Sequence, residues 1–133
     1  GDGMYFYNYA PTITNSIIRG NGRSEIYQSG GSLTITWSNV PRSHTGMGNI
    51  DADPRFIRPW EEGSGDFHLM PDSPCVDAGN PDPSCNDRSR PPGLGTECCD
   101  MGAYGGPGNS GWPVIVEPTP IPEPVGVPRW VEY

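Results

Sequence analysis

The chain has 133 residues, with 19 glycines and 17 prolines, about 27% of the total, and only 33% hydrophobic residues. Glycine and proline cost about 1 and 3 kcal/mol per residue in a helix interior, which argues against a helical architecture, and no apolar run approaches the roughly 20 residues of a membrane span. Sixteen acidic residues against eight arginines and no lysine give a net charge of −8, a poor match for the phosphates of a nucleic acid.

The first part of the chain contains an internal repeat, in which positions 4–18 recur as positions 26–40. Five positions are identical between these two segments, and two more are conservatively replaced. The matched pairs are Met4/Ile26, Tyr5/Tyr27, Thr12/Thr34, Ile13/Ile35, Thr14/Thr36, Ser16/Ser38 and Ile18/Val40. The offset between the two segments is 22 residues, and a period of this length is typical of stacked-repeat architectures.

Within each repeat the pattern indicates short strands joined by tight turns. Residues 12–14 and 34–36 alternate polar and apolar, as half-buried strands do, and clusters rich in glycine, asparagine and serine occupy residues 19–22 and 29–32. Stacking two repeats would place the apolar members of each pair in an inner column and the threonines outside. The sequence therefore predicts a parallel β-helix of about two coils over residues 1–48.

From Asn49 the repeat is lost, and residues 49–108 are expected to form a cap. The apolar residues expected to cover the end of the inner column are Phe56, Ile57, Trp60, Phe67, Leu69 and Val76. The opposite end has no comparable cap: Met4 and Tyr5 are already in register, and no signal peptide precedes them, so the chain is expected to be processed or part of something longer. An open edge of this kind is a template for another chain.

The four cysteines, Cys75, Cys85, Cys98 and Cys99, lie within a stretch rich in glycine, proline and aspartate. Such a stretch builds little apolar core, and its spacing is not that of a zinc site, so we expect two disulfides and an oxidising, extracellular setting. Because a bond between the neighbouring Cys98 and Cys99 would be strained, two arrangements remain open. They are Cys75–Cys98 with Cys85–Cys99, and Cys75–Cys99 with Cys85–Cys98.

Oxygen-bearing side chains gather in the same cap. They suit Ca²⁺, although their spacing does not match an EF-hand loop. The candidate ligands are Asp77, Asn80, Asp82, Asp87 and Asp100. The alternative is that they form Asx turns without a metal; no cofactor is otherwise required.

Residues 109–133 form a proline-rich tail. Proline, which has no N–H, occupies every second position at Pro118, Pro120, Pro122 and Pro124. An extended tail would therefore keep hydrogen-bond donors on one edge only and could add to a sheet as an edge strand. The tail is expected either to be an extended linker or to dock on another subunit or along its own coils. The residues predicted to support self-association are Met4, Tyr5, Ile115, Ile121 and Trp130.

No catalytic constellation is found, so we do not expect an enzyme. The predicted strands carry Thr, Ser and Ile rather than clustered carboxylates. Asp51 and Asp53 are expected to bond local backbone, Glu61 and Glu62 to lie in a solvated loop, and His44 and His68 to have polar surface roles.

Several motifs together resemble the last coils and C-terminal cap of secreted bacterial right-handed parallel β-helix proteins, of the pectin-lyase-like superfamily. The motifs are Gly-Asp-Gly-Met-Tyr (1–5), Pro-Thr-Ile-Thr-Asn-Ser-Ile-Ile-Arg-Gly-Asn (11–21), Asn-Ile-Asp-Ala-Asp-Pro-Arg-Phe (49–56), Asp-Phe-His-Leu (66–69), Asp-Ser-Pro-Cys-Val-Asp-Ala-Gly (72–79) and Asp-Met-Gly-Ala-Tyr-Gly-Gly (100–106). The resemblance covers residues 1–108 and implies the fold. It does not select a function, because this fold hosts lyases, hydrolases, adhesins and structural proteins.

The sequence favours an extracellular or cell-surface structural module, a filament subunit joined by end-to-end stacking and by docking of its tail. Its expected partners are copies of itself or upstream β-helix coils, with neither nucleic acid nor membrane insertion. The alternative is the C-terminal fragment of a carbohydrate-active or carbohydrate-binding β-helix protein, with a polysaccharide as its partner. In that case the exposed aromatics, Tyr5, Tyr7, Tyr9 and Tyr27, would stack on sugars.

Overall fold

The computed structural model describes residues 2–42, 44–61 and 64–111, and most of its regular elements are strands. The strands are β1 (Asp2–Tyr7), β2 (Thr12–Thr14), β3 (Ser24–Ser29), β4 (Thr34–Thr36), β5 (Phe56–Glu61) and β6 (Ser64–Leu69). Two short 3-10 helices follow, η1 (Pro83–Cys85) and η2 (Pro107–Gly111). The described residues include no helix long and apolar enough to cross a membrane. The fold is predominantly β, as expected.

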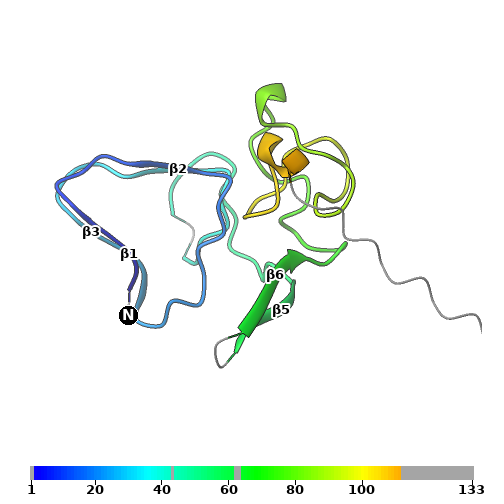
Figure 1. Cartoon of the computed structure of the whole chain (residues 1–133). Helices are drawn as coiled ribbons and strands as arrows, with labels where there is room; N and C mark the ends of the chain where they lie inside the picture. The colour runs from blue at the N-terminus through cyan, green and yellow to red at the C-terminus, as the bar shows by residue number, and fades with distance from the viewer. Residues whose placement is uncertain (1, 43, 62–63, 112–133) are drawn as a thin grey trace, which may run out of the picture.

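The offset of the sequence repeat is the register in which the first two turns of the chain pair. Strand β1 runs parallel to β3, with Met4 opposite Ile26, and β2 runs parallel to β4, with Ile13 opposite Ile35. An isolated parallel bridge from Ile17 to Asn39 continues the same offset. The two turns accordingly lie over one another in Figure 1, where β1 and β3 run side by side.

An apolar column runs inside the two turns. Ile18, Ile35 and Val40 form its buried centre, and the residues packed against that centre are Met4, Ile13, Ile26 and Leu33. The strand threonines lie on the outer side, exposed or half-buried, so the predicted inside and outside faces are confirmed. Burying one such aliphatic side chain contributes about 1.5–3 kcal/mol, which makes this column the main apolar support of the turns.

The corners of the two turns repeat as well as the strands. Asn8 and Gly30, which occupy equivalent positions in the two repeats, both adopt positive φ, at 55° and 73°, and Asn15 and Trp37 do so at 51° and 50°. A Cβ atom on Gly30 would overlap Oδ1 of Asn8, so the stacked corner needs glycine on its second layer. Asparagine tolerates this left-handed region better than most residues, which accounts for its place at the corner of the first turn.

The third turn of the chain is much shorter than the first two. Asn39 bridges in parallel to Ile50, at half the offset of the earlier turns, and Val40 N–H donates to the Ile50 carbonyl at 2.9 Å. Ile50 N–H in turn donates to the Ser38 carbonyl at 2.9 Å. Parallel pairing therefore extends two residues past 48, along one side of the turn only.

Strands β5 and β6 form an antiparallel hairpin that extends away from the two turns (Figure 1). Phe56 and Phe67 meet edge to face across it, with ring centroids 5.2 Å apart. Six apolar residues of the cap were expected to cover the end of the inner column. For two of them, Ile57 and Phe67, this is wrong, because their side chains are 53% and 41% exposed. The cap contacts the turns through hydrogen bonds, since Gly102 N–H donates to the Asn15 carbonyl at 2.9 Å and Asn80 N–H donates to the Asn15 side chain at 2.7 Å.

Truncating the column should destabilise the fold far more than truncating the hairpin. Ile35 is 2% exposed, so Ile35→Ala leaves a cavity and should lower the free energy of unfolding by about 2–5 kcal/mol. Ile57→Ala is the matched control and should cost less than about 1 kcal/mol. Urea denaturation of both variants measures the difference, and equal losses would show that the column is not the core.

Candidate functional site

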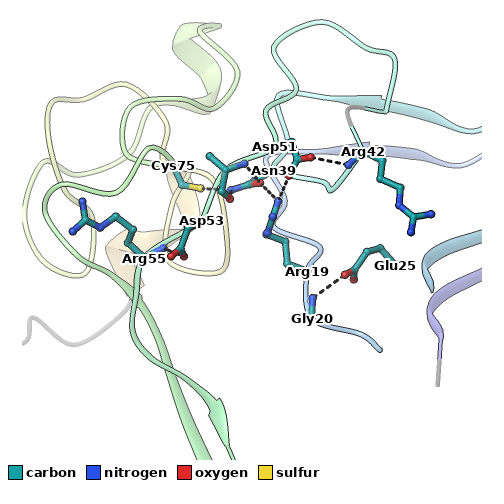
Figure 2. Close-up of polar contacts among 10 residues, drawn as sticks. Arg19, Gly20, Glu25, Asn39, Arg42, Asp51, Asp53, Arg55 and Cys75 are labelled. Carbon is teal, nitrogen blue, oxygen red and sulfur yellow. Dashed lines mark hydrogen bonds and ion pairs between the residues drawn. The ribbon is translucent and has the colours of Figure 1, made fainter. Parts of the chain in front are cut away.

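A buried asparagine joins the second turn to the cap. Asn39 has 0% exposure, and its side chain is fully hydrogen-bonded. Its Nδ2 donates to the Ala52 carbonyl at 2.9 Å and to Cys75 Sγ at 3.0 Å, while its Oδ1 accepts from Arg19 at 3.0 Å and from Ala52 N–H at 3.3 Å (Figure 2). Asn39 is not among the residues predicted from the sequence, although one signal was available. Asn39 is polar where the first repeat has Ile17.

Arg19 connects this asparagine to the surface. Its guanidinium donates to Asp51 Oδ1 at 2.8 Å as well as to Asn39, and Asp51 Oδ2 accepts from Arg42 N–H at 2.8 Å. These contacts, with the Arg19 hydrogen bond as the largest cause, hold the pKa of Asp51 below its usual value. Since both Arg19 and Asp51 are partly exposed, the pair positions the chain more than it stabilises it.

The two aspartates at the start of the cap bond backbone, as expected. Asp51 accepts from Arg42 N–H, and Asp53 Oδ1 accepts from Arg55 N–H at 2.9 Å. The Arg55 guanidinium forms an ion pair with Asp72 at 2.7 Å on the surface. Each carboxylate therefore binds a backbone N–H group of its own, and the two do not point toward a common ligand site.

An aromatic surface lies on the outer side of β1 and β3. Tyr5 and Tyr27 stack with ring centroids 5.0 Å apart and planes within 5°, and they remain 61% and 46% exposed. Tyr7 and Tyr9 are exposed as well. The rings of the stacked pair also line a shallow hollow with Arg23 and Ser24. Of the predicted self-association residues, Met4 packs inward against the column and Tyr5 lies on this surface, while Ile115, Ile121 and Trp130 lie outside the described residues.

The candidate calcium ligands nearest the surface of the cap are engaged by the chain itself. Asp77 accepts from both N–H and hydroxyl of Thr96 at 2.9 Å. Asn80 Oδ1 accepts from Asp82 N–H at 3.0 Å, and Asp82 Oδ1 accepts from Ser84 N–H at 2.8 Å. The contacts of Asn80 and Asp82, each with the N–H two residues further on, are Asx turns, whereas Asp77 joins two distant parts of the cap.

The two remaining candidate ligands are buried and bind backbone N–H groups too. Asp87 Oδ2 accepts from the N–H groups of Asp100 and Gly106, at 2.8 and 3.2 Å. Asp100 accepts from Asp77 N–H at 2.8 Å and Leu94 N–H at 2.9 Å. Over residues 2–42, 44–61 and 64–111, no three His, Cys, Asp or Glu side chains are grouped so as to hold a metal ion. Calcium binding stays a prediction.

Burial sets the electrostatics of this pair. It raises the pKa of Asp100 to about 6, despite the two N–H groups that favour the charged form. Burial raises the pKa of Asp87 as well. The charge of Asp87 further raises the pKa of Asp100, and the charge of Asp77 raises the pKa of both.

All four cysteines are free thiols, so neither expected two-disulfide arrangement is present in the structure. Cys75 and Cys99 are buried, Cys85 is half-buried and Cys98 is exposed. Cys75 is held under the second turn by its contact with Asn39, and burial raises the pKa of its thiol. The disulfides stay a prediction.

His68 is more integrated than a surface histidine. Its Nδ1 lies 2.5 Å from Asp66 Oδ1, and its ring stacks on Tyr104 with centroids 3.7 Å apart. The contact with His68 holds the pKa of Asp66 below its usual value. His68 thereby joins β6 to the end of the cap, whereas the side chains of Glu61 and Glu62 lie outside the described part of the chain.

Comparison of the chain with protein-family models, with curated proteins and with solved structures found no match.

Buried Asp100 should make the cap sensitive to pH. Because its folded pKa is raised from 3.8 to about 6, its protonated form contributes stability fully below about pH 4, and this is lost as the pH rises through about 6. A difference of that size between the folded and unfolded pKa corresponds to something on the order of 3 kcal/mol. Asp100→Asn should flatten the dependence of the unfolding free energy on pH between 4 and 7.

Asp82→Asn is the control, because Asp82 is exposed and its pKa is lowered rather than raised. Its pH profile should keep the wild-type fall between pH 4 and 7. Chemical denaturation at a series of pH values measures both profiles, and an unchanged slope in Asp100→Asn would show that Asp100 does not titrate in this range.

Proposed function

We propose that the chain is the end of a right-handed parallel β-helix, a non-catalytic structural module. Three features support this architecture: the shared register of β1 with β3 and of β2 with β4, the continuation of that register at Ile17 and Asn39, and the repeated positive φ at the corners. The motifs that resemble secreted bacterial β-helix proteins supply the handedness and an extracellular or cell-surface location.

The module assembles by head-to-tail stacking of copies of itself. Among the described residues, β1 pairs only with β3 and β3 only with β1, so this two-stranded sheet has two outer edges that lack a strand partner. Placing β1 of one copy beside β3 of the next would continue the sheet with all strands parallel. Since the two edges differ, the contact is heterologous and propagates into a filament unless it closes into a ring.

The stacked pair of Tyr5 and Tyr27 is the observation that carries this proposal. Stacking at 5.0 Å matches the spacing of neighbouring strands, so a tyrosine at each layer can continue the column of rings. With Tyr5 61% exposed, its outer face is available to the Tyr27 of a neighbouring copy. Each such contact adds about 0.5–1.5 kcal/mol beyond the area it buries.

The same surface supports a second candidate, binding of a carbohydrate by a module of a larger protein. The hollow beside Tyr5 and Tyr27 combines two aromatic rings with the polar side chains of Arg23 and Ser24. Ring faces and hydrogen-bonding groups together suit a sugar, whose faces are apolar and whose edge carries hydroxyls. Under this alternative the chain binds glycans as a monomer.

Assembly should depend on Tyr5 and not on Tyr9. We expect the purified chain to form fibres in negative-stain micrographs, and Tyr5→Ala should raise the concentration needed for fibres about ten-fold, as the loss of about 1.4 kcal/mol per contact implies. Tyr9→Ala is the matched control, since Tyr9 is exposed but lies outside β1, and should leave that concentration unchanged.

Light scattering and microscopy across a concentration series measure both variants. A chain that stays monomeric at every concentration, or an equal effect of the two substitutions, would contradict stacking. Binding to a glycan array by monomeric protein, lost in Tyr5→Ala, would instead support the carbohydrate alternative.

A further inference from the structure

One carboxylate holds the corner between the first and second turns of the chain. Glu25 Oε1 accepts from Gly20 N–H at 2.9 Å (Figure 2), and Glu25 Oε2 accepts from Asn21 N–H at 3.2 Å. The side chain of Asn21 donates to the same Oε2 through its Nδ2, at 2.6 Å. The Asn21 amide is therefore a hydrogen-bond donor placed directly against a negative charge.

The first strand lies against the same amide. A Cβ atom on Gly3 of β1 would come within 2.5 Å of Asn21 Nδ2 and within 2.6 Å of the Glu25 carbonyl oxygen. Asn21 and Glu25 are both half-buried. A change in the size or charge of the Asn21 side chain would therefore act on β1 as well as on the corner.

The residue that follows Asn21 exposes a backbone nitrogen that can react with it. The sequence contains one Asn-Gly pair, Asn21-Gly22. Gly22 is exposed, with a φ of 82°, and none of the described residues accepts a hydrogen bond from its N–H. Because glycine has no Cβ, no side chain of its own hinders the approach of this nitrogen to Cγ of Asn21.

From these contacts we infer that Asn21 is a site of deamidation, and that the carboxylate formed there weakens the joint between the two turns. The Gly22 nitrogen attacks Asn21 Cγ, and a succinimide ring forms as the Cγ–Nδ2 bond breaks. The proton lost by the Gly22 nitrogen leaves with Nδ2 as ammonia. Water then adds to one of the two ring carbonyls and opens the ring, which leaves aspartate or isoaspartate, and no electrons are exchanged.

Either product removes a contact on which the corner depends. Position 21 loses the donor that binds Glu25 Oε2 and gains a negative charge close to it, and like charges at this range repel each other. Isoaspartate also lengthens the backbone by one carbon between the two turns. The apolar column keeps all of its side chains, so the expected result is a folded but less stable chain.

The modification is tested on the folded full chain, held at neutral and at alkaline pH and digested with trypsin after increasing times. Arg19 and Arg23 flank the site, so trypsin releases it as peptide 20–23. This peptide should gain the mass difference between an amide and a carboxylic acid, at a rate that rises with hydroxide concentration, because the attacking nitrogen must lose its proton.

Peptide 24–42, which carries the fully buried Asn39, is the internal control and should keep its mass. An unchanged peptide 20–23, an equal gain in peptide 24–42, or a rate that does not depend on pH would overturn the assignment of the site.

The structural consequence is tested with Asn21→Asp, which reproduces one of the two products. This variant should lower the urea midpoint of unfolding, because it places the new charge beside Glu25. Asn8→Asp is the matched control and should leave the midpoint unchanged, since Asn8 is exposed and lies at another corner of the first turn, where aspartate also tolerates positive φ.

Glu25→Gln separates repulsion from lost packing. Added to Asn21→Asp, it should recover at least half of the midpoint that Asn21→Asp loses, and a double-mutant cycle with Glu25→Gln alone isolates the coupling between the two side chains. Equal midpoints for Asn21→Asp and the wild type, or no recovery in the double variant, would contradict the inference. Neither test involves fibres, so a failure of stacking leaves both results interpretable.

Discussion

The fold depends on one buried amide. Asn39 sits where the parallel register of the two long turns ends, and every polar atom of its side chain is bonded, to the first turn through Arg19 and to the cap through Ala52 and Cys75. A buried amide left without partners costs about 1–3 kcal/mol, so this position tolerates only the arrangement in which turn, arginine and cap all meet. The asparagine thereby fixes where the repeats stop and the cap begins.

The same position explains why the two ends of the column differ. Up to Asn39 the layers keep one constant offset, with an isoleucine stacked on an isoleucine at 13 and 35. Beyond it the chain returns after half that length to Ile50, which pairs along residues 38–40 and leaves the outer edge of β3 without a strand partner among the described residues. A turn half as long can cover only one side of the second turn. The outer edge of β3, which it leaves uncovered, is where a neighbouring copy would pair.

The turns were predictable from sequence because identical residues lie opposite one another in their parallel register, as Thr12 does with Thr34. The cap was not, because its order comes from single side chains bonding backbone N–H groups far along the chain. Asp100, for example, binds residues 77 and 94. No local period encodes such contacts. Aromatic residues were also misleading: Phe67 resembles a core residue in sequence, yet it packs on Phe56 in the hairpin and is 41% exposed.

The turns and the cap are thus stabilised by different interactions. The turns rely mainly on the apolar column, while the cap relies on buried carboxyls, on hydrogen bonds among glycine-rich loops and on a few buried apolar side chains, namely Cys75, Cys99 and Met101. Asp87 and Asp100 are the part of the cap whose charge is most costly, because burial raises the pKa of both carboxyls. The electrostatic cost at neutral pH therefore falls on the cap, and not on the strands that carry the stacking surface.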